Sequence, residues 1–168
     1  MEVKGKVLVF GDNINTDVII PSKYLTSLDP DEWAKHAMES LDPTFPIKAK
    51  EEVIIVAGKN FGCGSSREQA PIALKHAGAK CVVAESFARI FFRNAINIGL
   101  PVIECPSILK KTSEGDQLLI NLASGEITNL TKNMKLKALE LPDFILKIIS
   151  AGGLIEHLKR RLKSHGRL

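Results

Sequence analysis

Three apolar runs alternate with two helical patterns in the middle of the chain, and this alternation restricts the possible folds more than any other feature. The runs EEVIIVAG, KCVVAES and LPVIEC occupy residues 51–58, 80–86 and 100–105, and each has the length of a buried strand. The stretches between them, REQAPIALKHAG and SFARIFFRNAINIG, have helical patterns. Strand, helix, strand, helix, strand predicts right-handed crossovers and a parallel sheet. We therefore expect an α/β fold.

The segments before the first of these runs predict four short elements and a helix. We expect a strand over residues 4–11 and a turn-rich loop over residues 12–17. A short apolar segment over residues 18–21 and a projecting loop over residues 22–28 follow. Asp29 is a good helix N-cap, Pro30 suits the first helical position, and Glu32 completes a capping pattern. A helix is therefore expected over residues 30–41.

The C-terminal third has a different pattern. QLLINLASGEITNL, residues 117–130, predicts two strands around a Ser-Gly turn, which would add antiparallel strands to the sheet. PDFILKIISAGGLIEHLKRRLK predicts two helices separated by Gly152 and Gly153. The basic tail, residues 159–168, is expected to be a solvated helix end. The chain has 168 residues and no internal repeat, so we expect a single domain, residues 1–168.

Composition argues against several classes of protein. The net charge of +4 is compatible with an acidic substrate, but aromatic residues make up only 5% and no basic stripe is interleaved with them, which argues against a nucleic-acid partner. The N-terminal segment does not have the pattern of a signal peptide, and no apolar stretch is long enough for a membrane helix, so we expect a cytoplasmic protein with no membrane contact. Cys63, Cys81 and Cys105 lack the CxxC spacing of metal ligands.

The loop GKNFGCGSSREQAP, residues 58–71, follows a predicted strand and enters a predicted helix. Ser65 and Glu68 have the S-x-x-E spacing of a capping box, so Ser65 could simply cap that helix. Pro71 cannot donate to the Arg67 carbonyl, so in that case the first turn is distorted or the regular helix begins later.

The same loop could instead hold an anion. Free backbone N–H groups and the positive end of a helix favour negative charge. Gly62 and Gly64 would let a ligand approach the main chain, and Arg67 could form a bidentate pair with a carboxylate. A phosphate would also suit such a loop, although the Walker and GxGxxG patterns are absent. The local pattern leaves capping and anion binding open.

Three motifs, GDNINTDVIIPSKYL, GKNFGCGSSRE and ESFARIFFRNAINIGLPVIE, resemble in the same order the small subunits of 3-isopropylmalate dehydratase. These correspond to the swivel domain of the aconitase superfamily, and the resemblance runs from about residue 4 to residue 160. It implies a β/β/α swivel domain with a mainly parallel central sheet. It also implies a lyase of leucine biosynthesis that dehydrates 2-isopropylmalate and rehydrates the product to 3-isopropylmalate. A separate large subunit would carry a [4Fe–4S] cluster, so that this chain binds no metal.

The resemblance implies roles for individual residues. Ser65 matches the catalytic base. Asp17 matches an acidic residue at the edge of the active site, and we expect it to position the loop of residues 58–71, called the serine loop below, or the arginine of that loop. A turn or cap role for Asp17 stays open. The groups expected to bind a small hydroxy-dicarboxylic acid are Thr16, Gly64, Ser66 and Arg67.

Other polar residues have simpler interpretations. Cys63 is expected to be a small packed thiol beside the loop. Arg89 and Arg93 could touch substrate or partner, or could form salt bridges within the chain. Four histidines are expected to be surface or packing residues, namely His36, His76, His157 and His165.

The segment Tyr24, Leu25, Thr26 and Ser27 is expected to set substrate specificity. Homoaconitase-type relatives place an arginine where Thr26 stands, and an uncharged residue cannot neutralise a further carboxylate. This favours isopropylmalate, while 2,3-dimethylmalate, citramalate and homocitrate stay open. An alternative of another class is an anion- or RNA-binding module.

Overall fold

Within residues 1–164, which the computed structural model describes, seven strands form one mixed sheet in the order β4-β3-β2-β1-β5-β6-β7. Neighbouring strands among β1, β2, β3 and β4 pair in parallel. Strand β5 pairs antiparallel with β1, and β6 and β7 follow it, also antiparallel. The predicted α/β class with antiparallel additions is therefore confirmed. The strands are β1 (Glu2–Val9), β2 (Val53–Ala57), β3 (Ala79–Ala84), β4 (Val102–Glu104), β5 (Gln117–Asn121), β6 (Glu126–Asn129) and β7 (Met134–Lys137).

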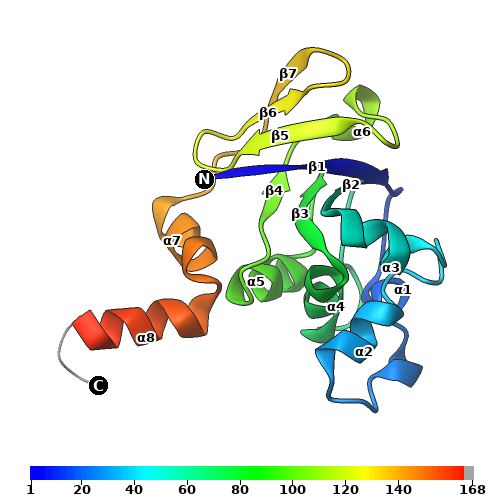
Figure 1. Ribbon diagram of the computed structural model, residues 1–168, viewed down its shortest axis with the longest axis vertical. Helices are drawn as coiled ribbons and strands as arrows, with labels where there is room; N and C mark the ends of the chain where they lie inside the picture. Colours follow the sequence, from blue (N-terminus) through cyan, green and yellow to red (C-terminus); the bar gives the residue numbers. More distant parts are fainter. Residues whose placement is uncertain (165–168) are drawn as a thin grey trace.

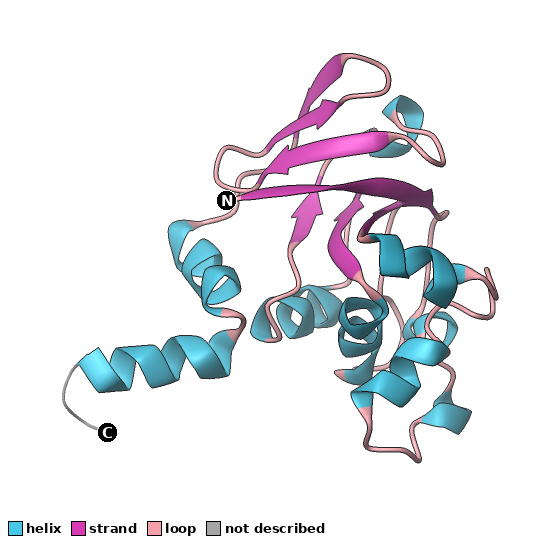
Figure 2. Ribbon diagram, viewed as in Figure 1, coloured by secondary structure: helices cyan, strands magenta, loops and turns pink. Residues whose placement is uncertain are grey.

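Helices connect the parallel strands and extend the C-terminal end (Figure 1). Figure 2 shows most of them gathered below the parallel strands, with β5 to β7 above. The α-helices are α1 (Thr16–Ile19), α2 (Pro30–Lys35), α3 (Phe45–Lys48), α4 (Gln69–Ala77), α5 (Arg89–Asn97), α6 (Ile108–Lys111), α7 (Asp143–Ala151) and α8 (Leu154–Ser164). Two short 3₁₀ helices are η1 (Ser22–Tyr24) and η2 (Ala49–Glu51).

Apolar side chains on the two faces of the sheet form two separate clusters. All five residues of β2 are buried, as its continuous apolar run predicts, because neighbouring residues of a strand point to opposite faces. Ile55 joins the cluster covered by helices α2, α4 and α5, while Ile54 joins the other cluster. That second cluster is closed by Leu118 and Ile127 of the antiparallel strands and by Ile108 of α6. The antiparallel strands therefore cover the apolar side chains on this face of the sheet, in place of a second layer of helices.

The predicted helix over residues 30–41 is wrong at its C-terminal end. Asp29 does cap it, accepting a hydrogen bond from the Asp31 amide at 3.0 Å, but α2 ends at Lys35. Met38 lies in the left-handed region with φ of 59°, its side chain is fully buried, and its amide donates to the Ile19 carbonyl at 2.9 Å. Burial of Met38 and this tertiary hydrogen bond take the chain out of helical geometry.

Three further details differ from the sequence-based expectation. Glu32 does not complete a capping box, since its carboxylate pairs with Lys35 at 2.6 Å. Helix α1 replaces the end of the predicted loop 12–17 and the start of the apolar segment 18–21. Strand β7 was not predicted, because its sequence MKLK is short and half charged. The helix pair separated by Gly152 and Gly153 is confirmed, with φ values of 94° and 134° at the two glycines.

No helix within residues 1–164 is both long and apolar enough to cross a bilayer. Residues 159–164 are exposed, as expected of a solvated helix end, and the rest of the basic tail, residues 165–168, lies outside the described residues.

Ile55→Ala should lower the free energy of unfolding by about 2–5 kcal/mol, because the lost methyl groups leave a cavity in a fully buried strand. Ile47→Ala is the matched control: Ile47 is 70% exposed, and its loss should change stability by no more than about 0.5 kcal/mol. Urea denaturation of both variants measures the difference. Equal costs would contradict the assignment of the core.

Candidate active site

The candidate site lies where the loops after β1 and β2 meet. These strands are parallel neighbours, so both loops leave the carboxyl edge of the sheet, where ligands bind in open α/β folds. Three backbone hydrogen bonds join the loops along their length: Asn13 N to Lys59 O at 2.8 Å, Gly62 N to Ile14 O at 2.7 Å, and Thr16 N to Cys63 O at 2.8 Å. The motif containing NTD is thereby fixed beside the motif containing GSSRE.

Helix α1 holds the first of these motifs in place. The Asn15 side chain caps it, accepting a hydrogen bond from the Val18 amide at 2.8 Å. The cap places Thr16 and Asp17 in the first turn, facing the serine loop. Our sequence reasoning did not single out Asn15, although Asn is among the preferred N-cap residues and could have indicated the helix.

Thr16 contacts Ser65 through its hydroxyl group. Thr16 is 1% exposed, and its Oγ1 donates to the Ser65 carbonyl at 3.0 Å and lies 3.1 Å from Ser65 Oγ. A threonine hydroxyl has one proton, so it can serve the carbonyl or Ser65 Oγ but not both at once. If Ser65 were deprotonated, rotation of the Thr16 hydroxyl would turn that proton toward the alkoxide. Ser65 and Ser66 are themselves exposed.

Asp17 and Arg67 form an ion pair with an Oδ1–Nη1 distance of 2.6 Å. Arg67 Nη1 also donates to the Ile20 carbonyl at 3.1 Å, and the Arg67 side chain is only 16% exposed. Within the described residues, Nη2 and Nε make no hydrogen bond. The guanidinium is therefore held on one side and keeps donors free for a bidentate partner. This geometry agrees with the predicted positioning role of Asp17; the Ile20 carbonyl has no sequence signal.

The two loop glycines serve different purposes. Gly62 is buried with φ of 76°, and a Cβ atom there would lie 2.1 Å from Cγ of Phe91. The expectation that Gly62 lets a ligand approach is therefore wrong, because the Phe91 ring fills that space. Gly64 is exposed with φ of 92° and has no such obstruction, so a ligand could still approach its backbone.

Ser65 does not cap α4. The helix begins at Gln69 with Glu68 at the N-cap position, and the Ser65 hydroxyl contacts Thr16 instead of the Glu68 amide. The later helix start that Pro71 predicted is confirmed, since Pro71 lies in the first turn, where its missing N–H costs nothing.

The predicted specificity segment begins at Tyr24, the last residue of η1 and four residues after Ile20. The Tyr24 ring stacks on His36 with centroids 3.6 Å apart. Trp33 Nε1 donates to the Ser27 carbonyl at 3.0 Å. Leu25 packs against the first apolar cluster, while Thr26 is exposed.

The cysteines do not converge on one point. Cys81 and Cys105 are buried in the second apolar cluster, where burial raises the pKa of the Cys81 thiol far above its usual range and that of Cys105 to about 11. Cys63 is partly exposed in the serine loop. No three His, Cys, Asp or Glu side chains of residues 1–164 are grouped as metal ligands would be.

Within residues 1–164, His36, Arg89 and Arg93 form no hydrogen bond or ion pair with Ser65, Ser66 or Arg67. His36 contacts Glu32 and Glu39, whereas His165 falls outside the described residues. Arg89 and Arg93 are exposed and line a cavity of about 250 Å³ with Glu104, and neither forms an ion pair within residues 1–164.

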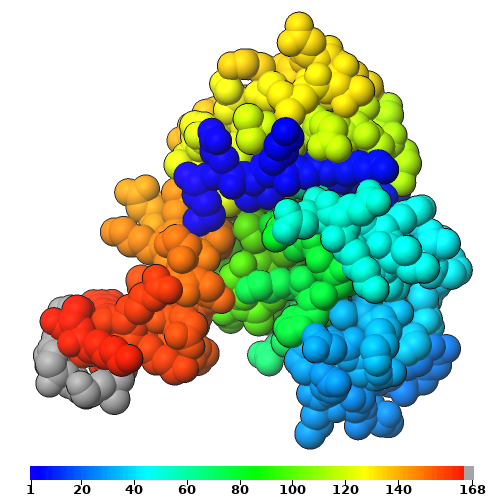
Figure 3. All heavy atoms as spheres, in the orientation of Figure 1, coloured from blue at the N-terminus to red at the C-terminus, as the bar shows by residue number. Residues whose placement is uncertain are grey.

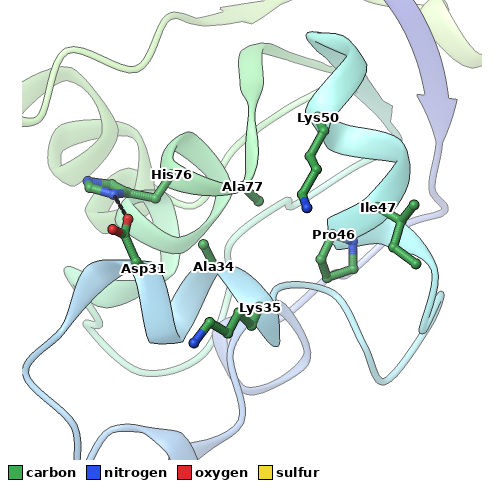
Figure 4. A pocket seen from close by; sticks show the side chains of 8 residues that line it. All are labelled: Asp31, Ala34, Lys35, Pro46, Ile47, Lys50, His76 and Ala77. Carbon is green, nitrogen blue, oxygen red and sulfur yellow. Dashed lines mark hydrogen bonds and ion pairs between the residues drawn. The ribbon is translucent and has the colours of Figure 1, made fainter.

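A cavity of about 450 Å³ lies between α2, α3 and the C-terminal end of α4 (Figure 4). His76 Nδ1 and Asp31 Oδ1 are hydrogen-bonded at 2.9 Å on one side, and Lys50 lies at the other. None of the predicted site residues lines it, because the serine loop precedes the opposite end of α4.

Comparison with known proteins identifies the family of this chain. Residues 12–107, which include both loops, match the family described as the aconitase C-terminal domain. The chain belongs to this family. Similar aconitase C-terminal domains include the 3-isopropylmalate dehydratase small subunit of Thermodesulfovibrio yellowstonii, 56% identical over 96% of each chain. The isopropylmalate/citramalate isomerase small subunit of Methanocaldococcus jannaschii is 56% identical over 95% of each chain.

A solved structure supports the fold of this aconitase C-terminal domain directly. The crystal structure of 3-isopropylmalate dehydratase (leuD) from Methanocaldococcus jannaschii superimposes with a TM-score of 0.93 at 47% identity, covering 99% of both chains. The resemblance to 3-isopropylmalate dehydratase small subunits is thus confirmed along nearly the whole chain.

Thr16→Val should loosen the serine loop, because valine keeps the shape of threonine but cannot donate to the Ser65 carbonyl. We expect a stability loss of about 1 kcal/mol and faster hydrogen exchange at the Arg67 amide, which donates to the same carbonyl. Thr16→Ser keeps the hydroxyl and is the control. Parent-like exchange in the valine variant would show that this hydroxyl does not order the loop.

Proposed function

We propose that this chain is the small subunit of a two-subunit 3-isopropylmalate dehydratase, which isomerises 2-isopropylmalate to 3-isopropylmalate by dehydration and rehydration. The observation that carries the proposal is the cluster of Ser65, Thr16, Asp17 and Arg67, held together by the contacts described above in a chain 56% identical to such small subunits. A cytoplasmic location stays a prediction.

Arg67 is proposed to grip a substrate carboxylate. Asp17 and the Ile20 carbonyl occupy Nη1, so Nη2 and Nε present a planar pair of donors that matches the two oxygens of a carboxylate. Burial of most of the side chain limits the rotamer entropy that binding would cost. Ser66 and the Gly64 backbone lie exposed beside this group and are proposed to add neutral hydrogen bonds.

Ser65 is proposed to remove the proton from the substrate carbon and to return it in the second half of the reaction. A serine hydroxyl is a very weak base in water, so its alkoxide needs nearby donors and positive charge. The Thr16 hydroxyl, 3.1 Å away, is one such donor, and the Arg67 guanidinium two residues along the loop supplies charge. An ion pair with Asp17 would keep that charge in a fixed place.

The proposed enzyme needs a second subunit. The cysteines of this chain do not fit an iron–sulfur cluster, because two are buried under the sheet and the third is in the serine loop. We propose that a large subunit carries a [4Fe–4S] cluster, which would supply a Lewis-acidic iron for the substrate hydroxyl. Exposure of Ser65 and Ser66 suits residues that meet a ligand held from the other side.

The second candidate function is isomerisation of citramalate, favoured by the name of the Methanocaldococcus relative. Dimethylmalate is a further possibility of the same chemical type. Homocitrate fits less well: Thr26 is uncharged, and the nearby cation Lys23 lies 3.4 Å from Glu39 and 4.6 Å above the Tyr24 ring. One assay with all four substrates distinguishes these candidates, and RNA titration at two salt concentrations tests the binding-module alternative.

Ser65→Ala should lower kcat by about 10²–10⁴-fold when the chain is combined with a cluster-bearing large subunit, because the proton acceptor is gone. The exposed position of Ser65 predicts an unchanged melting temperature. Steady-state kinetics at saturating small subunit measure the effect, with Ser113→Ala as a control remote from the site. A parent-like kcat would refute the assignment of the base.

Arg67→Lys should raise KM for the diacid roughly ten-fold or more, since an ammonium group cannot replace the bidentate fork. The lysine can still approach Asp17, so the fold should survive. The control is Lys75→Arg on α4, which makes the reverse exchange between the same two residue types. An unchanged KM for Arg67→Lys would place the substrate carboxylate elsewhere.

A further inference from the structure

Helix α8 projects from the body of the molecule (Figure 3). It carries an apolar stripe that no other part of the described chain covers. Ile155, Leu158 and Leu162 recur at helical spacing on one side of it, and they are 63%, 42% and 41% exposed. None of the residues of α8 is buried within the described chain. An amphipathic helix whose apolar side faces water is typical of a surface that another molecule covers.

A cavity of about 270 Å³ continues this stripe toward the serine loop. It is lined by Leu154 and Ile155 of α8, by Asn94 and Asn97 of α5, and by Glu68, which directly follows Arg67. One surface therefore leads from the proposed catalytic loop, over α5, to the apolar stripe of α8.

Asn94 gives this surface an unmet hydrogen-bonding requirement. Its Nδ2 atom is buried and has no hydrogen-bond partner within the described residues. An amide donor left without an acceptor costs free energy, and native proteins seldom leave one so. Asn94 lines the cavity, and because its Nδ2 atom is buried, a shift of this side chain would have to accompany binding for an incoming acceptor to reach it.

Helix α5 extends the same surface. Ile90, Arg93, Asn94 and Asn97 lie on one side of the helix by their spacing of three and four residues. Ile90 is 47% exposed, and Arg93 is exposed without an ion pair in the described chain. We call the set made by both helices the α5–α8 face: Ile90, Arg93, Asn94, Asn97, Ile155 and Leu158.

Charge distinguishes between the molecules that could cover this face. Helix α8 carries Lys159, Arg160, Arg161 and Lys163 against the single acid Glu156. A second copy of the chain would bring the same cations, and like charges across an interface cost free energy. An acidic protein surface would complement them, and it could also provide the acceptor that Asn94 lacks.

We propose that the α5–α8 face is the docking surface for an acidic region of the large subunit. This inference rests on the proposed function. The apolar stripe would supply the buried centre of the contact, Arg93 and the α8 cations its charged rim, and a carbonyl or carboxylate oxygen of the large subunit would accept from Asn94 Nδ2. Because Glu68 lines the same cavity and directly follows Arg67, docking at this face would hold the serine loop over the shared active site.

The test measures binding of the full chain to the large subunit of a 3-isopropylmalate dehydratase. The double variant Ile155→Ser with Leu158→Ser should weaken binding roughly ten-fold or more, and Asn94→Ala roughly five-fold. At saturating small subunit kcat should stay within about two-fold, since neither change touches the proposed catalytic groups. Raising the salt concentration should also weaken binding of the parent chain.

The matched control is Ile47→Ser with Leu139→Ser, which removes two side chains that are 70% and 56% exposed but lie outside the α5–α8 face. Its affinity should equal that of the parent. Melting temperatures establish that all variants are folded, including Asn94→Ala, whose side chain is partly buried.

Parent-like affinity in both face variants would overturn the proposal. It would also fail if the parent chain were a dimer that Ile155→Ser with Leu158→Ser made monomeric, or if the stripe bound vesicles containing anionic lipid more tightly than the large subunit. Binding is measured without substrate. Face-dependent binding in a complex that turns over no substrate would therefore defeat the proposed function and support the interface.

Discussion

β1 and β2 run parallel, with Lys6 opposite Val53 and Val9 opposite Val56, so the loops that follow them leave the sheet side by side. Hydrogen bonds between residues 13–16 and 59–63 extend this pairing beyond the strands. Every contact of the candidate site depends on that extension, because Thr16 and Asp17 come from one loop while Ser65 and Arg67 come from the other. Thr16 and Ser65 are 49 residues apart in the sequence, and the parallel register of β1 and β2 brings them together in space.

The candidate site has the features that the proposed half of an active centre would need. Thr16 and the mostly buried Arg67 have partners within the chain, whereas both serines are exposed and Nη2 and Nε of Arg67 make no hydrogen bond within residues 1–164. On the α5–α8 face an apolar stripe is exposed, and Asn94 Nδ2 has no hydrogen-bond partner within residues 1–164. The cavity lined by Glu68, Asn94 and Ile155 joins this face to the serine loop, so these groups lie along one surface.

Local sequence signals predicted the elements well where local energetics decide them. Asp29 and Pro30 marked the start of α2, the continuous apolar run marked β2, and the glycine pair separated α7 from α8. Predictions failed where distant parts of the chain compete with local preference. Burial of Met38 ended α2 early, and the Phe91 ring took the space that Gly62 leaves. Neither partner could be identified from spacing along the sequence.

The sequence by itself determined the α/β alternation, the family and the residue types available for chemistry, because hydrophobic periodicity, turn residues and motifs are properties of neighbouring positions. Only the tertiary structure decided that Asp17 pairs with Arg67, that Thr16 touches Ser65, and that Asn94 Nδ2 has no acceptor within residues 1–164. Those facts depend on distances between segments that the chain brings together only when the sheet and its covering helices are complete.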